Sequence, residues 1–304
     1  MATKNILITG ASGLIGQRLT ELLLQKGYHV SHLGRKSREG KIPSYVWDIE
    51  QGIVDGRAFQ NIDSVIHLAG AGVADKPWTQ KRKHEILESR TKSTQLLFRE
   101  LSKNKHSIKS FISASAIGYY GFGDSEEVFV EENEAGTDFL ASVTSQWETE
   151  VDKLNELYLR VVKVRIGIVL SDKGGALKPM ILPIKLFAGS PLGSGKQYMS
   201  WIHIDDLCRL FIHAVENESM AGAYNAVAPV PVTNKEFIKT ISKVVERPLW
   251  LPNVPGFVLK LLLGEMAGLI LNGSRIDSSK IQKTAFQFQY PILDDALRNL
   301  LKPQ

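Results

Sequence analysis

Apolar residues in the first part of the chain fall into short, nearly continuous blocks that are separated by helical patterns. Residues 5–9 form the first block, which ends at Gly10. Leucine and isoleucine then recur at helical spacing over residues 14–24, and Gly27 stops that pattern before a second block at residues 29–33. Strands that are buried on both faces of a parallel sheet have this continuous apolar character. We therefore predict a strand, a helix and a second, parallel strand.

The same alternation continues to residue 170. Further apolar blocks lie at 44–49, 63–70, 110–116 and 161–170, and a long amphipathic pattern covers 79–104. This order predicts an α/β fold with a Rossmann-type, doubly wound parallel sheet. From about residue 172, prolines and glycine-rich turns become frequent, and we expect a smaller, mixed C-terminal substrate lobe. We place the first domain at 1–171 and the lobe at 172–304, with a strand and helix near 201–228 returning to the first domain.

Three glycines follow the first strand at three-residue spacing. Gly10 allows a sharp turn, Gly13 removes a side chain where a pyrophosphate approaches, and Gly16 lets the helix pack closely on the strand. The N-terminus of the helix offers N–H groups and a partial positive charge to phosphates. A purely structural tight turn is the alternative. We predict a dinucleotide site made by Gly10, Ser12, Gly13, Leu14, Ile15 and Gly16.

The end of the second strand indicates which dinucleotide is bound. A site that prefers NAD places Asp or Glu there to bind the ribose 2′-hydroxyl, whereas this chain has Gly34-Arg35-Lys36. Two cations would pair with a 2′-phosphate, so we expect NADP(H); a solvated basic loop is the alternative. Asp48, at the end of the third strand, is assigned to the adenine by position alone. The strand at 63–68 ends in Ala69-Gly70, small residues that let the backbone pass close to the cofactor, and His67 within it is interpreted as a core residue.

Composition excludes several other classes of protein. The chain has 304 residues, of which 43% are hydrophobic and 23% charged, with a formal net charge of +5 at pH 7. Its basic residues are too scattered for a nucleic-acid surface, and no apolar run reaches the ~18 residues of a membrane span. The lone Cys208 leaves no internal disulfide and no zinc cluster. We expect a cytoplasmic monomer or homodimer with a small-molecule substrate and with no metal, nucleic-acid or membrane partner.

Motifs in a particular order extend over nearly the whole chain. They are Thr9–Gly16, His67–Gly70, Trp78-Thr79, Ser89-Arg90 with Thr94, Trp147-Glu148, Gly174–Leu177, Gly193–Gln197, Trp201–Leu207 and Asn225–Pro229. Together they resemble the extended short-chain dehydrogenase/reductases, and among these the atypical "epimerase family protein" subgroup. The resemblance implies a Rossmann domain that binds NADP(H), and a C-terminal lobe. It also implies cofactor contacts from Leu68, Ala69, Glu85, Arg90 and Ile168.

The proton-transfer residues of that superfamily are incomplete here. Its members position the substrate oxygen with a Ser or Thr and transfer the proton with a Tyr and a Lys that lie four residues apart on one helix face. Ser115 matches the serine, but alignment on Trp147-Glu148 puts Leu140 and Thr144 where the Tyr and the Lys should be. No Tyr in the chain has a Lys four residues later.

Two interpretations of that absence stay open. In the first, the protein is an NADP(H)-dependent oxidoreductase or epimerase in which Ser115 positions the substrate oxygen as a donor and Tyr119 or Tyr120 serves as the acid; packing of the loop is the alternative role of both tyrosines. In the second, the protein binds NADP(H) without turnover, as a sensor or regulatory protein. The lobe segments 193–201 and 252–271 favour the enzyme. A nucleic-acid or division-regulator role is a third hypothesis, and Asp205 and Asp206 are interpreted as helix caps.

Overall fold

The first apolar block becomes a central strand of a mostly parallel sheet. The computed structural model describes residues 3–37, 39–122 and 127–302. The sheet has the order β12-β8-β6-β5-β1-β2-β3-β4, and the short β4 is antiparallel to β3, whereas the other pairs are parallel. Its strands are β1 Asn5–Thr9, β2 His29–Gly34, β3 Ser44–Asp48, β4 Ile53–Val54, β5 Ser64–His67, β6 Ser110–Ala116, β8 Arg160–Ile166 and β12 Gly222–Ala226.

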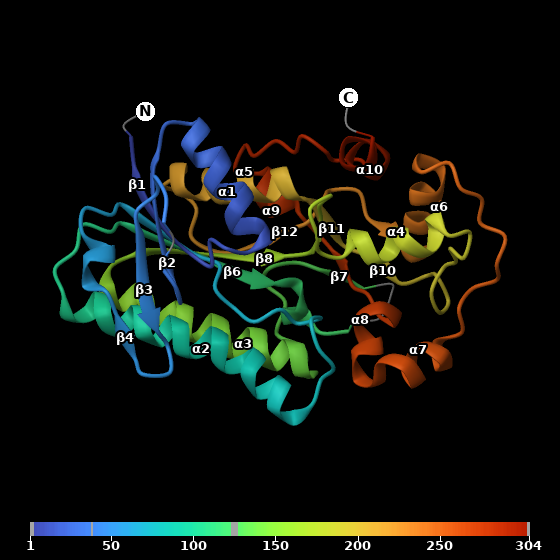
Figure 1. Cartoon of the computed structure of the whole chain (residues 1–304), viewed down its shortest axis with the longest axis horizontal. Coiled ribbons are helices and arrows are strands. Elements are labelled where there is room, and N and C mark those ends of the chain that lie inside the picture. Colours follow the sequence, from blue (N-terminus) through green and yellow to red (C-terminus); the bar gives the residue numbers. More distant parts are fainter. Residues whose placement is uncertain (1–2, 38, 123–126, 303–304) are drawn as a thin grey trace.

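Helices cover both faces of this sheet. α1 (Leu14–Gln25) and α5 (Ile204–Glu216) pack against each other on one face, and α2 (Gln80–Lys103) and α3 (Phe139–Asp152) on the other (Figure 1). Because both faces are covered, Ile6, Leu7 and Ile8 of β1 are all fully buried, which explains the continuous apolar block. The predicted doubly wound Rossmann-type sheet is confirmed.

The chain reverses its direction of travel across the sheet between β1 and β5. It runs outward from β1 through β2 and β3, and then returns to the opposite side of β1 as β5. In open α/β sheets, ligands bind at the carboxyl ends of the strands at such a reversal. The topology therefore points to the carboxyl ends of β1 and β5 as the place of the site.

The prediction of one strand over residues 161–170 is wrong. Gly167 separates β8 from β9 (Ile168–Leu170), and β9 leaves the central sheet to pair with β11 (Trp201–His203). A methyl group on Gly167 would overlap the carbonyl oxygen of Ser200, so this close crossing requires glycine. The break directs the chain from the sheet into the C-terminal part.

The C-terminal part is built from short elements. Its strand pairs are β10 (Tyr198–Met199) with β13 (Val232–Thr233) and β7 (Val128–Phe129) with β14 (Arg275–Ile276). Its remaining elements are α4 Leu177–Lys185, α6 Asn234–Val244, α7 Gly256–Leu263, the 3₁₀ turn η4 Gly264–Ala267, α8 Gly268–Leu271, α9 Ser279–Gln282 and α10 Leu293–Leu301. Three further 3₁₀ turns belong to the first part: η1 Gly56–Phe59, η2 Ile117–Tyr120 and η3 Lys153–Leu157.

The start of α5 also differs from the prediction. The N-cap is His203, whose Nδ1 accepts the Asp205 N–H at 3.0 Å, so neither aspartate is the cap. Asp205 instead pairs with Arg18 of α1 at 2.6 Å. The fully buried Asp206 accepts two backbone N–H groups, from Gln289 and Tyr290. Both carboxylates therefore have structural roles: Asp205 binds α1 to α5, and Asp206 binds the backbone of residues 289–290 to α5.

Candidate dinucleotide site

The glycine turn brings the ends of β1 and β5 into direct backbone contact. Gly10 has φ +69°, and a methyl group on it would lie 2.7 Å from the carbonyl carbon of Leu68 and 2.8 Å from the nitrogen of Ala69. A methyl group on Gly16 would lie 2.6 Å from the Cα of Ala11. Such distances exclude any side chain, so glycine is required at both positions. The turn therefore leaves a backbone-lined cradle at the carboxyl edge of the sheet.

The N-terminus of α1 completes this cradle. Its N-cap is Gly13, which offers no side chain to the N–H groups of the first turn. Those N–H groups and the helix dipole suit a phosphate. The first turn carries the predicted contacts Leu14, Ile15 and Gly16, and a methyl group on Gly175 would lie 3.3 Å from Leu14. The residues present thus fit the pyrophosphate of a dinucleotide.

Thr9 and His67 hold the two strand ends together beneath the cradle. Thr9 Oγ1 accepts the N–H groups of Leu68 and Ala69 at 3.2 and 3.3 Å, and lies 2.7 Å from His67 Nδ1. His67 Nε2 lies 3.3 Å from the hydroxyl of Thr94. Burial, with the nearby charge of Arg90, lowers the pKa of His67 to about 3, so the ring is neutral. The interpretation of His67 as a satisfied core residue is confirmed.

Arg90 is a partly buried cation beside the end of β5. Its guanidinium lies 5.3 Å from the Trp147 ring, and its Nη1 donates to the carbonyl of Ile86 at 2.8 Å. A methyl group on Gly70 would lie 3.2 Å from its Cζ. Burial, with the charge of Arg82, lowers the pKa of Arg90 to about 10. No carboxylate among the described residues pairs with it, since Asp75 and Glu85 pair with Arg82, and a partly buried, unpaired cation suits an anionic ligand.

The other predicted cofactor contacts are spread more widely. Arg35 and Lys36 are exposed directly after β2, and neither has an ion pair within the described ranges. Asp48 accepts the Gln51 N–H at 3.0 Å and so closes the turn after β3. Glu85 is exposed on α2 and pairs with Arg82 at 2.7 Å. Ile168 begins β9. Their contact with a cofactor stays a prediction.

Ser115 is held by a buried ion pair. Its Oγ donates to Glu148 Oε1 at 2.6 Å, and Glu148 binds Arg165 through two hydrogen bonds of 2.9 Å. Although burial opposes ionisation, the hydrogen bond and charge of Arg165, helped by Lys163, keep the pKa of Glu148 below its usual value. The carboxylate is therefore ionised, and it accepts the one hydrogen bond that the Ser115 hydroxyl can donate. This conflicts with the expectation that Ser115 acts as a donor to the substrate oxygen.

Leu140 and Thr144, which we expect at the positions of the Tyr and the Lys, lie on the same face of α3 as Glu148, toward its N-terminus. Leu140, Thr144 and Glu148 follow one another at four-residue spacing, and a methyl group on Gly118 would lie 3.4 Å from Leu140 and 3.8 Å from the Thr144 hydroxyl. Eight residues of helix rise about 12 Å, so Ser115 meets α3 two turns away from Leu140. Gly118, three residues after Ser115, is the part of this turn that comes close to Leu140.

The two tyrosines of η2 have different surroundings. The Tyr120 hydroxyl donates to Asn225 Oδ1 at 2.7 Å and accepts from Arg165 at 2.9 Å, and burial raises its pKa to about 12. Tyr120 is thus a structural residue. The half-buried Tyr119 lies with its ring 3.5 Å from the Arg165 guanidinium carbon. Among the described hydrogen bonds none engages its hydroxyl, so Tyr119 is the tyrosine of this turn that is left to meet a substrate.

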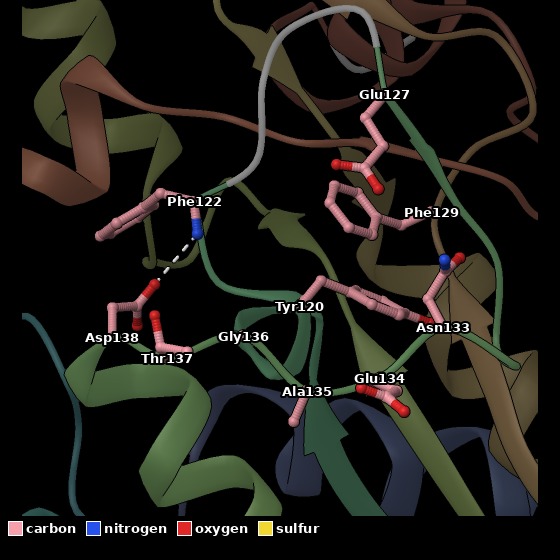
Figure 2. A pocket seen from close by; sticks show the side chains of 10 residues that line it. All are labelled: Tyr120, Phe122, Glu127, Phe129, Asn133, Glu134, Ala135, Gly136, Thr137 and Asp138. Carbon is pink, nitrogen blue, oxygen red and sulfur yellow. Dashed lines mark hydrogen bonds between the residues drawn. The ribbon is translucent and has the colours of Figure 1, made fainter.

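A pocket of about 640 Å³ opens beside Tyr120 (Figure 2). The Phe122 and Phe129 rings stand on its two sides, and the segment that leads into α3 forms its floor. Asp138 accepts the Phe122 N–H at 3.0 Å and also caps α3, which fixes one wall. Its acidic lining residues are Glu127, Glu134 and Asp138.

Glu148 and Arg165 are not among the cofactor-binding or catalytic residues that the sequence predicts. A signal for them was present, because Arg165 stands inside an otherwise apolar strand and a buried cation needs a counter-charge. Nothing in the spacing showed that this counter-charge is Glu148 or that it also binds Ser115.

Comparison with known proteins identifies the family. The model of the "NAD dependent epimerase/dehydratase family" matches residues 6–226, and a second model, "Domain of unknown function (DUF1731)", matches residues 254–300. The chain belongs to the NAD-dependent epimerase/dehydratase family. Family membership supports a nicotinamide cofactor. In the described part of the chain no helix is long and apolar enough to cross a membrane, and no three metal-ligating side chains gather.

Relatives and solved structures agree with this assignment. The chain is 40% identical to the "Epimerase family protein YfhF" of Bacillus subtilis over 300 residues, 98% of each chain. It is 38% identical to the "Epimerase family protein SSP1921" of Staphylococcus saprophyticus over 309 residues, 98% of this chain and 99% of that one. The human epimerase family protein SDR39U1, crystallised with NADPH, matches with a TM-score of 0.88 and 30% identity over 99% of this chain and 100% of its own. A nucleoside-diphosphate sugar epimerase from Corynebacterium glutamicum matches with a TM-score of 0.80 and 29% identity over 99% of this chain and 58% of its own.

Proposed function

We propose that this protein binds NADP(H) and exchanges a hydride between it and a small hydroxyl or carbonyl compound, as an oxidoreductase or epimerase. The observation that carries the proposal is the pair of exposed cations, Arg35 and Lys36, at the end of β2. An NAD site would place a carboxylate there, and a 2′-phosphate supplies the negative charge that these side chains lack. The NADPH in the human relative supports the same cofactor.

The roles of the binding residues follow from their positions. The Gly10–Gly16 turn and the first turn of α1 would hold the pyrophosphate, and Arg35 with Lys36 the 2′-phosphate. Gly70 and the partly buried Arg90 would lie beside the next part of the cofactor at the end of β5. When bound, the cofactor supplies a hydride donor or acceptor at its nicotinamide. The described residues of the chain bind and orient it.

Proton transfer falls to Tyr119 in this proposal. Its hydroxyl is not engaged by any described hydrogen bond, and its ring is held against Arg165. The Ser115 hydroxyl donates its only hydrogen bond to Glu148, so it can only accept a hydrogen bond from a substrate. A serine in this state would bind a substrate hydroxyl, and would not polarise a carbonyl.

A second candidate function is NADP(H) binding without turnover. Leu140 and Thr144 occupy the positions of the acid and the lysine, and the Thr144 hydroxyl donates to the carbonyl of Leu140 within its own helix. This arrangement leaves the cofactor cradle intact and the usual proton-transfer face without an ionisable group.

One pair of measurements separates the two functions. Calorimetry should give a Kd for NADPH at least tenfold below that for NADH, which corresponds to ~1.4 kcal/mol. Hydride exchange is then followed in both directions by mass spectrometry. NADPH deuterated at C4 is incubated with the protein and carbonyl compounds, and NADP+ is incubated with the protein and nucleotide sugars or hydroxysteroids that are deuterated at the carbon bearing the hydroxyl. Transfer to one class supports the enzyme. Tight binding with no transfer to any class supports the sensor, and equal Kd values contradict the assignment of NADP(H).

A further inference from the structure

One end of the molecule exposes many large apolar side chains. α4, α6 and α7 gather at this end (Figure 1). The exposed residues, which we call the end patch, are Leu182, Leu186, Phe187, Trp250, Phe257, Leu261 and Leu262. Seven exposed large apolar side chains on neighbouring segments indicate an interaction site, whereas single exposed apolar residues elsewhere are ordinary.

α7 is the clearest part of the end patch. Of its eight residues Leu259 alone is buried, whereas Phe257, Leu261 and Leu262 are 72%, 84% and 73% exposed. Phe257 and Leu261 are four residues apart, so they share one helix face. A helix with this much apolar surface normally packs it against another element, and among the described residues nothing covers this face.

Contacts between side chains and backbone join the segments that carry the end patch. The Arg247 guanidinium lies 5.2 Å from the Phe187 ring, and a methyl group on Gly189 would lie 3.0 Å from Leu249. The end of α4 and the segment before Trp250 are therefore neighbours. The β-bridge between Leu192 and Val254 continues this contact toward the start of α7.

The charged residues within the segments that carry the end patch are all basic. Residues 173–204 and 247–264, which carry its seven members, contain no Asp or Glu. They contribute the exposed cations Lys178, Lys185, Arg247 and Lys260. Of the acidic residues that flank these segments, Glu246 pairs with Lys302, Glu265 pairs with Lys83 and Asp205 pairs with Arg18, whereas Asp172 has no cationic partner among the described residues.

We propose that the end patch docks this protein on the surface of an anionic membrane. Leucine and aromatic side chains on an exposed helix enter the boundary between headgroups and acyl chains, and a basic rim binds the lipid phosphates. A second copy of the chain fits poorly, because a two-fold contact would bring together two surfaces that both carry Lys185, Arg247 and Lys260, which are like charges. The expectation of no membrane partner came from the lack of a spanning segment, which does not bear on surface binding.

Vesicle sedimentation with the full chain tests this. Vesicles of phosphatidylcholine alone are compared with vesicles that hold about one third phosphatidylglycerol. We expect the partition coefficient to be at least about tenfold higher on the anionic vesicles and to fall as salt is raised. The double variant Phe257→Ser, Leu261→Ser should lose at least about tenfold of that binding, because it removes two inserted apolar side chains. Lys185→Gln with Lys260→Gln should weaken binding to the anionic vesicles only.

Matched controls keep the result specific. Ile53→Ser removes another exposed apolar residue, from β4, far from the end patch, and should leave vesicle binding unchanged. Calorimetric NADPH binding by each variant shows that it is folded. Equal binding to both kinds of vesicle, or an unchanged double variant, would overturn the proposal. Self-association that the double variant abolishes, without vesicle binding, would assign the patch to a second copy; binding of poly-glutamate without vesicle binding would assign it to an acidic protein.

Discussion

The hydroxyl of Ser115 donates a 2.6 Å hydrogen bond to Glu148, which links the end of β6 to α3. Glu148 is also held by Arg165, and all three side chains are buried. Ser115, which the resemblance to the family predicts as the residue that positions the substrate oxygen, is therefore also part of a buried ion-pair network.

Removal of the Glu148 charge should destabilise the fold strongly. Glu148→Gln leaves Arg165 buried without a counter-charge, which costs about 3–5 kcal/mol, whereas Ser115→Ala removes one charge-assisted hydrogen bond and costs about 2 kcal/mol. Urea unfolding at pH 7 measures both. Loss of less than about 1 kcal/mol in Glu148→Gln would contradict a buried pair.

The same ion pair should make stability depend on pH. The folded-state pKa of Glu148 is below the unfolded value of about 4.5. Its contribution is therefore fully present above pH 4.5 and is lost as the pH falls through the lower, folded pKa. Urea midpoints of the wild type should drop across this window, and the drop should be smaller in Glu148→Gln.

Arg35→Ala should weaken NADPH binding at least tenfold, which is ~1.4 kcal/mol, and leave NADH binding unchanged, because only NADPH carries the 2′-phosphate. Calorimetry with both nucleotides measures this. Arg57→Ala is the control, since Arg57 is an equally exposed cation whose partner is Asp55. An equal loss for both nucleotides would place Arg35 away from the 2′ position.

Gly10→Ala should abolish dinucleotide binding. The new methyl group would lie 2.7 Å from the Leu68 backbone, in addition to the cost of a positive φ. Gly27 has φ +80° with no atom within 4 Å of such a methyl group, so Gly27→Ala carries only the backbone cost of about 1–2 kcal/mol. Thermal unfolding and NADPH titration of both variants separate the two effects, and full NADPH binding by Gly10→Ala would contradict the cradle.

Tyr119→Phe should slow hydride exchange by about 10²–10⁴-fold with an unchanged Kd for NADPH, since proton transfer contributes on that order. The control is Tyr120→Phe, which removes the hydroxyl that binds Arg165 and Asn225 and should act mainly on stability. A rate unaffected by Tyr119→Phe would leave this turn without a proton donor.

The cofactor cradle was predictable because its signals are local. Gly10, Gly13 and Gly16 lie within seven consecutive residues, and the strand and helix on either side of them follow from the spacing of apolar residues. Arg35 was equally local, because it directly follows a strand. The network of Ser115, Glu148 and Arg165 was not predictable in this way, since it joins β6, α3 and β8 through contacts between distant residues.

Two further differences have the same origin. The break at Gly167 depends on the backbone of Ser200, and the cap of α5 depends on a histidine side chain that accepts a hydrogen bond two residues later. Neither appears in a pattern of apolar and polar positions. The exposed face of α7 is a different case. Its apolar run can be recognised in the sequence, but only the structure shows that no described element covers it.

β12 has a consequence for the synthesis of the protein. It pairs with β8 in the central sheet, but about sixty residues separate Ile166 from Ala226 in the chain. At a synthesis rate of 5–20 residues per second, the ribosome needs roughly 3–12 s to supply β12, the strand that pairs with the edge of β8. During that time the nascent sheet has an unpaired apolar edge, which is a template for aggregation. The polypeptide that ends at residue 171 should therefore be insoluble alone, and chaperones should meet the nascent chain at this edge.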